Sequence, residues 1–182
     1  PIEDIQDIMV LGEVDFNKRF LEFLSQHEVV LHYFNYYGYY MGSFYPREHN
    51  NSGYMILQQA AHYLDDSKRV VLARCFVLGA VQNMKMVLKY YHKSGKPVAD
   101  AIRRLEENEK LIPSIDKIPE LMALEGNSKE EYYRTFDVIL DNPDFVFEKR
   151  TRRPPKNNLN TLISFGNSLI YTVVLSEIYT TH

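Results

Sequence analysis

The feature that most constrains the fold is a long, almost uncharged segment at residues 157–181. Its apolar and small side chains suit a helix, and between Lys156 and His182 it carries one formal charge, Glu177. Such a helix is not a solvated surface helix, and its length would allow a membrane span. Polar residues such as Asn160 and Asn167 argue against a span, because unpaired amides are costly in hydrocarbon. We therefore predict the buried central helix of an α-bundle.

A row of polar side chains follows one face of this predicted helix: Asn160, Ser164, Asn167 and Tyr171. Their spacing of three or four residues places them above one another. The row could hydrogen-bond a neighbouring helix or line a cleft, and the spacing alone favours the neighbouring helix. Gly166 in the same helix would let another backbone approach closely.

A basic stretch broken by two prolines leads into the helix. Its cations are Lys149, Arg150, Arg152, Arg153 and Lys156. The planar guanidinium forks suit phosphate, and a helix N-terminus next to them also favours anions. The alternative is a solvated basic loop without a partner, and the chemistry alone leaves both interpretations open. The net charge of −3 excludes a polybasic protein but not a local phosphate-binding patch.

Two kinds of pattern divide the chain into two domains. Short runs of β-prone residues predict strands at 5–10, 29–34 and 39–45, with a helix between the first two that Asp15 or Asn17 would cap. The run at 29–34 is continuously apolar, and the turn chemistry of residues 35–38 predicts a hairpin with the strand at 39–45. After the turn-forming residues 50–53, helical periodicity predicts helices at 54–64, 68–92, 98–111 and from Pro119 onward. Residues 65–67, Asp-Asp-Ser, would cap the helix at 68–92. We expect the helix at 98–111 to be charged and exposed.

The predicted fold class is therefore α+β. Residues 1–50 form a small β-rich domain and residues 51–182 form an all-α domain, and a hydrophobic content of 45% suffices for a packed core. The chain begins without an initiator methionine and ends just after a helix, so we expect both domains to be truncated parts of a longer protein.

One carboxylate, Glu125, stands beside the apolar face of its predicted helix, directly before Gly126. Residues 128–131 have a capping-box pattern, so the helix could restart after Gly126. A carboxylate in this place is either a boundary residue or a ligand for a hard metal ion. The boundary interpretation is favoured by the residues alone, since one carboxylate binds Mg²⁺ or Mn²⁺ poorly.

Other kinds of site find little support in the sequence. The single cysteine, Cys75, excludes an internal disulfide framework and a thiolate zinc cage, and it fits a reducing cytoplasm. The histidines are scattered over separate predicted elements: His27, His32, His49, His62, His92 and His182. We find no nucleophile–base pair, no glycine-rich phosphate loop and no signal peptide in the sequence, and we expect a cytoplasmic protein.

Two stretches together resemble a known family. Residues 121–132, Leu-Met-Ala-Leu-Glu-Gly-Asn-Ser-Lys-Glu-Glu-Tyr, resemble its "EG…Y" motif, and residues 152–171, which begin Arg-Arg-Pro-Pro-Lys-Asn-Asn-Leu-Asn, resemble its "RRPP…N-LLSFG-SLLY" motif. The segments 44–47 and 68–74, with Asn83, are also similar. On these motifs the chain resembles, over essentially its whole length, the spacer-acquisition integrases of CRISPR systems, the family called Cas one.

The resemblance implies a β-rich N-terminal domain, a helical C-terminal domain and a homodimer. It implies a metal-dependent DNA endonuclease and integrase that uses Mg²⁺ or Mn²⁺ and works with a small partner, Cas two. Such an enzyme inserts protospacer DNA into the CRISPR array by transesterification. Glu125 matches the family's metal-binding Glu, while the family's His and Asp lie beyond residue 182. His182 comes too early to be that His.

Two other functions stay open from the sequence. The chain could be a non-catalytic DNA-binding or assembly module that uses the basic stretch at 149–156, because the metal site is incomplete within these residues. It could also be a scaffold subunit that does not bind DNA. A His and then an Asp downstream of residue 182 would favour the integrase.

Overall fold

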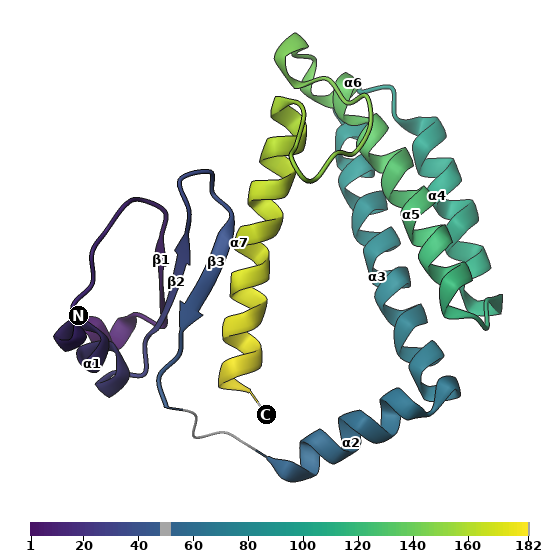
Figure 1. Cartoon of the computed structure of the whole chain (residues 1–182). Coiled ribbons are helices and arrows are strands. Elements are labelled where there is room, and N and C mark those ends of the chain that lie inside the picture. The colour runs from purple at the N-terminus through teal and green to yellow at the C-terminus, as the bar shows by residue number, and fades with distance from the viewer. Residues whose placement is uncertain (48–51, 182) are drawn as a thin grey trace. The chain divides into compact units, whose positions relative to one another are not determined.

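A computed structural model describes residues 1–47 and 52–181, and Figure 1 shows the elements with their labels. The predicted turn at residues 50 and 51 and the side chains of His49 and His182 lie outside the described residues. The chain forms two compact units, and each is described by itself. The sheet unit contains Pro1–Met55 and Leu162–His182, and the helical unit contains Ile56–Thr161.

The α+β fold class is confirmed, with a small sheet near the N-terminus and helices in most of the remaining chain. The unit boundaries differ from the single boundary that we predicted near residue 50. Most of the final helix, α7 (Asn158–Thr180), groups with the N-terminal residues rather than with the other helices.

The sheet unit is built on three strands in the order β1 (Asp7–Val10), β2 (Val30–Phe34) and β3 (Tyr40–Phe44). β2 pairs in parallel with β1 and antiparallel with β3, so it is the central strand. Four of its five residues are buried, and Tyr33 is exposed. The three strands and the hairpin between β2 and β3 were predicted from the sequence.

The connection between β1 and β2 is made by α1 (Lys18–Gln26). Asn17, one of the two predicted caps, accepts a hydrogen bond at its Oδ1 from the backbone N of Phe20 at 2.9 Å. The helix buries Leu24 against Val29 and Leu31 of the sheet, which gives the unit a small apolar core.

The hairpin between β2 and β3 turns at Asn35, whose Oδ1 accepts from the backbone N of Tyr37 and of Tyr39 at 3.0 Å each. Gly38 in this turn has a φ of 75°. A Cβ at that position would also stand 2.9 Å from the ring of Phe165. Only glycine fits this turn, because any larger residue would be strained in its backbone and would collide with the ring.

α7 is not the central helix of an α-bundle, and that prediction was wrong. The helix lies on the sheet: Ser176 Oγ is 2.8 Å from His32 Nε2, and Tyr179 donates to the carbonyl of Pro46 at 2.8 Å. Thr172 is buried at the same contact. Ser176 and Tyr179 therefore connect the helix to polar groups next to and within the sheet. Among the described residues, no atom lies within 4 Å of a Cβ built on Gly166, so the expected close approach is not observed.

Two helices, Asp66–Lys93 and Asn158–Tyr179, are long and apolar enough to cross a membrane by length and composition. This is weak support for a span, since the core helices of soluble proteins pass the same test.

The helical unit contains most of α2 (Gly53–Leu64), then α3 (Asp66–Lys93), α4 (Ala99–Leu111), α5 (Ile118–Arg134) and α6 (Phe136–Leu140). Short 3₁₀ turns at Ile112–Ser114 and Pro143–Phe145 follow α4 and α6. Asp65 caps α3, as predicted, by accepting from the backbone N of Lys68 at 3.1 Å.

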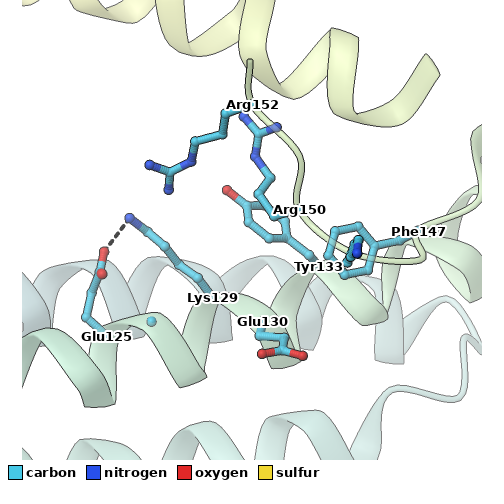
Figure 2. A pocket seen from close by; sticks show the side chains of 9 residues that line it. Glu125, Lys129, Glu130, Tyr133, Phe147, Arg150 and Arg152 are labelled. Atoms are coloured by element: carbon cyan, nitrogen blue, oxygen red, sulfur yellow. Dashed lines mark ion pairs between the residues drawn. The ribbon is translucent and has the colours of Figure 1, made fainter. Parts of the chain in front are cut away.

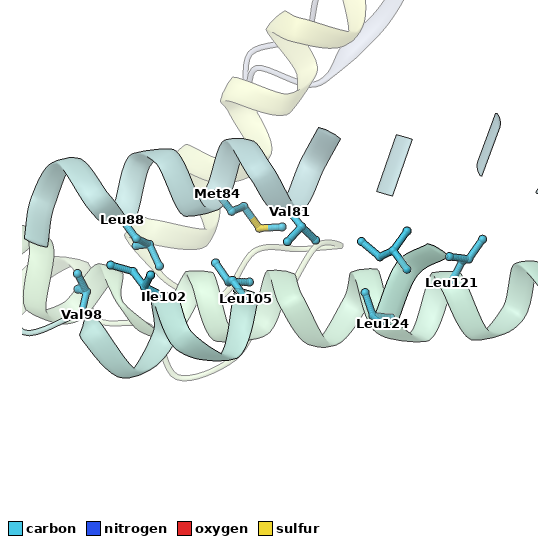
Figure 3. Packing of buried hydrophobic residues seen from close by; sticks show 9 residues of the cluster. Val81, Met84, Leu88, Val98, Ile102, Leu105, Leu121 and Leu124 are labelled. Carbon is cyan, nitrogen blue, oxygen red and sulfur yellow. The ribbon is translucent and has the colours of Figure 1, made fainter. Parts of the chain in front are cut away.

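The core of the helical unit lies where α3, α4 and α5 pack together, and Figure 3 shows its side chains. Val81, Leu88 and Leu105 are completely buried in it. α4 was expected to be exposed, but Ile102 and Leu105 point into this core. Their spacing of three residues puts both on one helix face. Of the charged residues of α4, Glu109 is 22% exposed and pairs with Lys85 of α3.

α5 runs without a break from Ile118 to Arg134, so the predicted restart after Gly126 is not observed. Ser128, the expected cap, is buried and donates from Oγ to the carbonyl of Leu124 at 2.8 Å. Its Oγ also accepts from Asn108 Nδ2 at 2.9 Å. The Ser128 hydroxyl therefore bonds within α5 and to α4 instead of capping a new helix. Because α5 is continuous, Glu125 lies in the middle of a helix rather than at its end.

Candidate functional site

A cavity of about 340 Å³ opens in the helical unit between α5 and the basic segment that precedes α7. Two carboxylates, four cations and two aromatic rings line it. The lining residues are Glu125, Gly126, Lys129, Glu130, Tyr133, Phe147, Lys149, Arg150 and Arg152. The fold thus brings Glu125 together with three of the five predicted phosphate-binding cations.

Glu125 contributes the carboxylate on the α5 side of the cavity. Its side chain is 29% exposed and forms an ion pair with Lys129, one helical turn further on (Figure 2). Residues four apart lie on the same helix face, which explains the pair. Lys129 was not among the predicted site residues, although its spacing from Glu125 in the sequence is the signal that could have identified it.

The described residues do not by themselves make a metal site. In the ranges 1–47 and 52–181, no three His, Cys, Asp or Glu side chains come together to hold an ion. Glu130 also lines the cavity, but its Oε1 accepts from Arg134 Nη2 at 2.6 Å. A hard divalent cation takes six or more oxygen ligands, so Glu125 alone, paired with a lysine, is insufficient.

Arg150 and Arg152 are two residues apart but differ in exposure and in hydrogen bonding. Figure 2 shows the guanidinium of Arg152 directed towards Lys129 and Glu125. Arg152 is exposed, and among the described residues its side chain has no hydrogen bond or ion pair.

Arg150 is turned back into its own segment. Its Nη1 donates to Asn160 Oδ1 at 3.0 Å and also to the carbonyl of Thr151. Burial lowers the pKa of the Arg150 guanidinium; Tyr133 opposes this effect and Arg152 adds to it. The side chain stays charged, because its ordinary pKa is far above neutrality. In this structure Arg150 is therefore held by its own segment, and its predicted contact with phosphate stays a prediction.

Asn160 is the centre of the contacts that hold the basic segment. It is completely buried, and its Oδ1 accepts from Arg150 and from the backbone N of Thr151 at 3.1 Å. Its Nδ2 donates to the carbonyl of Lys149 at 2.9 Å and to Asn157 Oδ1 at 3.0 Å. The sequence predicted an Asn160 contact with a neighbouring helix, and the structure shows a contact with the preceding loop.

Asparagines at the start of α7 attach the connector 144–147 in the same way. Asn157 accepts from the backbone N of Asn160 at 2.9 Å and so caps the helix. Its Nδ2 donates to the carbonyl of Val146 at 3.2 Å, and Asn158 Nδ2 donates to the carbonyl of Asp144 at 3.1 Å. An amide side chain can do both because it carries an acceptor and two donors.

The other predicted cations are divided between the cavity and its surroundings. Lys149 belongs to the lining, while Arg153 and Lys156 do not. Arg153 is exposed, and the backbone N of Lys156 donates to Thr151 Oγ1 at 2.9 Å. Whether any of these side chains binds DNA stays a prediction, as does the role of Glu125.

The whole chain, residues 1–182, matches the family described as CRISPR associated protein Cas1. A relative from Thermodesulfovibrio yellowstonii named CRISPR-associated endonuclease Cas1 2 is 58% identical over 182 residues, which is 100% of this chain and 55% of the relative. CRISPR-associated endonuclease Cas1 from Thermotoga maritima is 53% identical, with the same coverage of both. The chain thus spans about half the length of the curated relatives it matches.

Solved structures share the fold. A Cas1 protein from Thermotoga maritima superposes with a TM-score of 0.82 at 50% identity, covering 100% of this chain and 56% of that one. A casposase bound to an integration product superposes with a TM-score of 0.76 over 97% of this chain and 50% of its own. At 17% identity, this second likeness concerns the fold alone.

Proposed function

The chain belongs to the CRISPR-associated Cas1 family, and we propose that it is part of a DNA endonuclease and integrase that inserts protospacer DNA into a CRISPR array by metal-dependent transesterification. The observation that carries the proposal is the cavity in which Glu125 faces Lys129 and Arg152. Two relatives, 58% and 53% identical to the chain, carry the name endonuclease, which supports the proposal.

The charges of the cavity suit the backbone of a nucleic acid. Lys129, Lys149 and Arg152 place positive charge around a hollow wide enough for a phosphate group. Contacts to phosphate fix the position of DNA but do not select its sequence, and they make the affinity depend on salt. We therefore assign to this chain the binding of the DNA backbone.

We propose Glu125 as one ligand of Mg²⁺ or Mn²⁺. Because the described residues do not complete a metal site, the other ligands would come from elsewhere, and the family resemblance implies a His and an Asp that follow residue 182. A divalent ion supplies stabilisation of negative charge on a reacting phosphate when it is bound. In this chain Glu125 also forms an ion pair with Lys129.

The proposed partners are duplex or branched DNA, a second copy of the protein and the small protein Cas2. A complex entitled Cas6-RT-Cas1–Cas2 contains a chain that superposes on this one with a TM-score of 0.76. At 22% identity that likeness concerns the fold, so the partnership and the homodimer are proposals. A reducing cytoplasm is the expected location.

The test is metal-dependent cleavage and strand joining by the full-length protein, with Glu125→Ala compared with Glu120→Ala. Glu120 lies on the same helix with a side chain 56% exposed, so its change controls for loss of a carboxylate. We expect Glu125→Ala to abolish the Mn²⁺-dependent reaction while circular dichroism and the melting temperature stay close to those of the wild type. Retained activity would rule out the assignment of Glu125.

The second candidate is a non-catalytic DNA-binding or assembly module. The cations Lys129, Lys149 and Arg152 around the cavity favour it, because they could bind a DNA backbone without any metal-dependent reaction. A full-length protein that binds DNA but has no metal-dependent activity would support this candidate instead.

A further inference from the structure

We propose that Asn160 is a positioning residue that fixes the basic segment, so that Arg152 rather than Arg150 contacts the DNA phosphate at the cavity. The inference rests on the proposed function and deepens it, because it gives the contact with phosphate to Arg152 and a structural contact with Asn160 to Arg150. Asn160 itself is completely buried and would not touch DNA.

The hydrogen-bonding capacity of the Asn160 amide is fully used. An amide oxygen has two lone pairs and an amide nitrogen has two hydrogens. The oxygen accepts from Arg150 Nη1 and from the backbone N of Thr151, at 3.0 and 3.1 Å. The nitrogen donates to the carbonyl of Lys149 and to Asn157 Oδ1, at 2.9 and 3.0 Å. No smaller or apolar side chain could replace these four contacts.

These contacts fix the backbone directly before Arg152. The carbonyl of Lys149 and the N–H of Thr151 both bind the amide, so the peptide units around Arg150 cannot turn freely. On the other side, Thr151 Oγ1 accepts from the backbone N of Lys156 at 2.9 Å, which closes the segment into a loop. Arg152 therefore projects from a loop whose base is held by a rigid helix.

The two arginines then differ in what they can do. Arg150 donates hydrogen bonds to Asn160 and to the carbonyl of Thr151, and it would have to break these bonds to reach a phosphate. Arg152 extends towards Lys129 and Glu125 with its donors unused within the described residues (Figure 2). A planar guanidinium with free donors can bind a phosphate through two parallel hydrogen bonds.

A matched pair of substitutions tests the division of roles. Arg150→Met and Arg152→Met in the full-length protein each remove one charge and keep similar bulk. In a salt titration of duplex DNA binding, we expect Arg152→Met to reduce the slope of log K against log[salt] by about 0.9, the value for one phosphate contact. Arg150→Met should change the slope by less than half of that and should lower the melting temperature. A larger slope change for Arg150→Met would overturn the proposal.

A double-mutant cycle tests the part of Asn160. We expect Asn160→Ala to weaken DNA binding by about tenfold when Arg152 is present and by less than threefold in Arg152→Met, because residues that act through one another are not additive. A merely structural defect would lower binding by the same factor in both backgrounds, and that result would overturn the positioning role. If Asn160→Ala does not fold, Asn160→Asp serves in its place, since it keeps the acceptor for Arg150 and loses the donor to Lys149.

The outcomes separate this inference from the proposed function. A wild-type protein that does not bind DNA at low salt would contradict the proposed function itself. DNA binding with an additive cycle, or with equal slopes for the two arginine variants, would contradict only the roles given to Asn160 and Arg152.

Discussion

The two units of the chain bury different kinds of side chain. The helical unit closes α3, α4 and α5 over an apolar cluster that includes Val81, Leu88 and Leu105 (Figure 3). The sheet unit has a smaller apolar core, and its contact with α7 buries the polar residues His32 and Ser176. An apolar core needs the right volume, whereas a buried polar contact also needs a partner for each donor and acceptor.

The polar contact of the sheet unit meets that requirement. Both ring nitrogens of His32 have a hydroxyl within hydrogen-bond distance, Ser43 Oγ at 2.5 Å and Ser176 Oγ at 2.8 Å. Tyr40 extends the network with its hydroxyl 2.7 Å from Ser43 Oγ. Such a network specifies where α7 lies on the sheet, because a shift of the helix would leave buried polar groups unpaired.

The largest expected effect concerns the apolar core. Leu105→Ala removes a fully buried side chain, and we expect the free energy of unfolding of the helical unit to fall by about 2–5 kcal/mol. Hydrogen exchange of the backbone amides in α4 measures that loss. Met122→Ala, at a residue 67% exposed, is the control and should change exchange little. Equal effects of the two changes would mean that this cluster is not the core.

The second prediction is that lower pH destabilises the sheet unit more than the helical unit. Burial lowers the pKa of His32 below its ordinary value of 6.5, and Asp7 on the adjacent strand partly opposes this. Well above pH 6.5 the His32 side chain is neutral in both the folded and the unfolded state. Below pH 6.5 the unfolded state takes up a proton first, so the sheet unit loses stability as the pH falls towards the lower folded pKa. Each unit of pKa difference contributes about 1.4 kcal/mol.

Hydrogen exchange of β2 at pH 7.5 and pH 5.5, corrected for the intrinsic rate, measures this loss. The stability of β2 should fall at the lower pH by more than that of α4, whose core contains no histidine. His32→Gln keeps a polar side chain without a titrating group and should remove most of the difference. A pH dependence unchanged in His32→Gln would contradict the role given to His32.

Much of the fold could be predicted because local chemistry decided it. Asn17 and Asp65 cap their helices as expected, since a short polar side chain before a periodic apolar run has few other uses. The continuous apolar run of β2 and the hairpin turn at Asn35 were also local signals. In the two caps and the turn, the polar side chain accepts a hydrogen bond from a backbone N–H only two to four residues away.

The parts that could not be predicted depend on partners far away in the sequence. The polar row of α7 indicated a contact for Asn160 but not that the preceding loop would be its partner. The contact between Ser176 and His32 lies outside that row and was not predicted. Ser128 had the pattern of a cap, yet Asn108 from another helix binds it inside a continuous α5. Arg150 and Arg152 look alike in the sequence, and only the position of Asn160 turns one of them inward.

The candidate site shows the same limit. Glu125 and the basic stretch were found from motifs, and the fold places Glu125, Lys149 and Arg152 around one cavity. Lys129 was missed, because a Glu–Lys pair one turn apart is common on helix surfaces and carries little functional signal by itself.

The most direct test of the central claim, that DNA enters the cavity beside Glu125, is site-specific crosslinking in the full-length protein. Lys129→Cys and Glu120→Cys, each in a background in which Cys75 and any other cysteine of the full-length protein are replaced by serine, would carry a photoactivated label and be irradiated with duplex DNA. Position 120 lies about half a turn around α5 from position 129. We predict a DNA adduct from position 129 and little from position 120. Equal adducts, or an adduct from position 120 alone, would contradict the account.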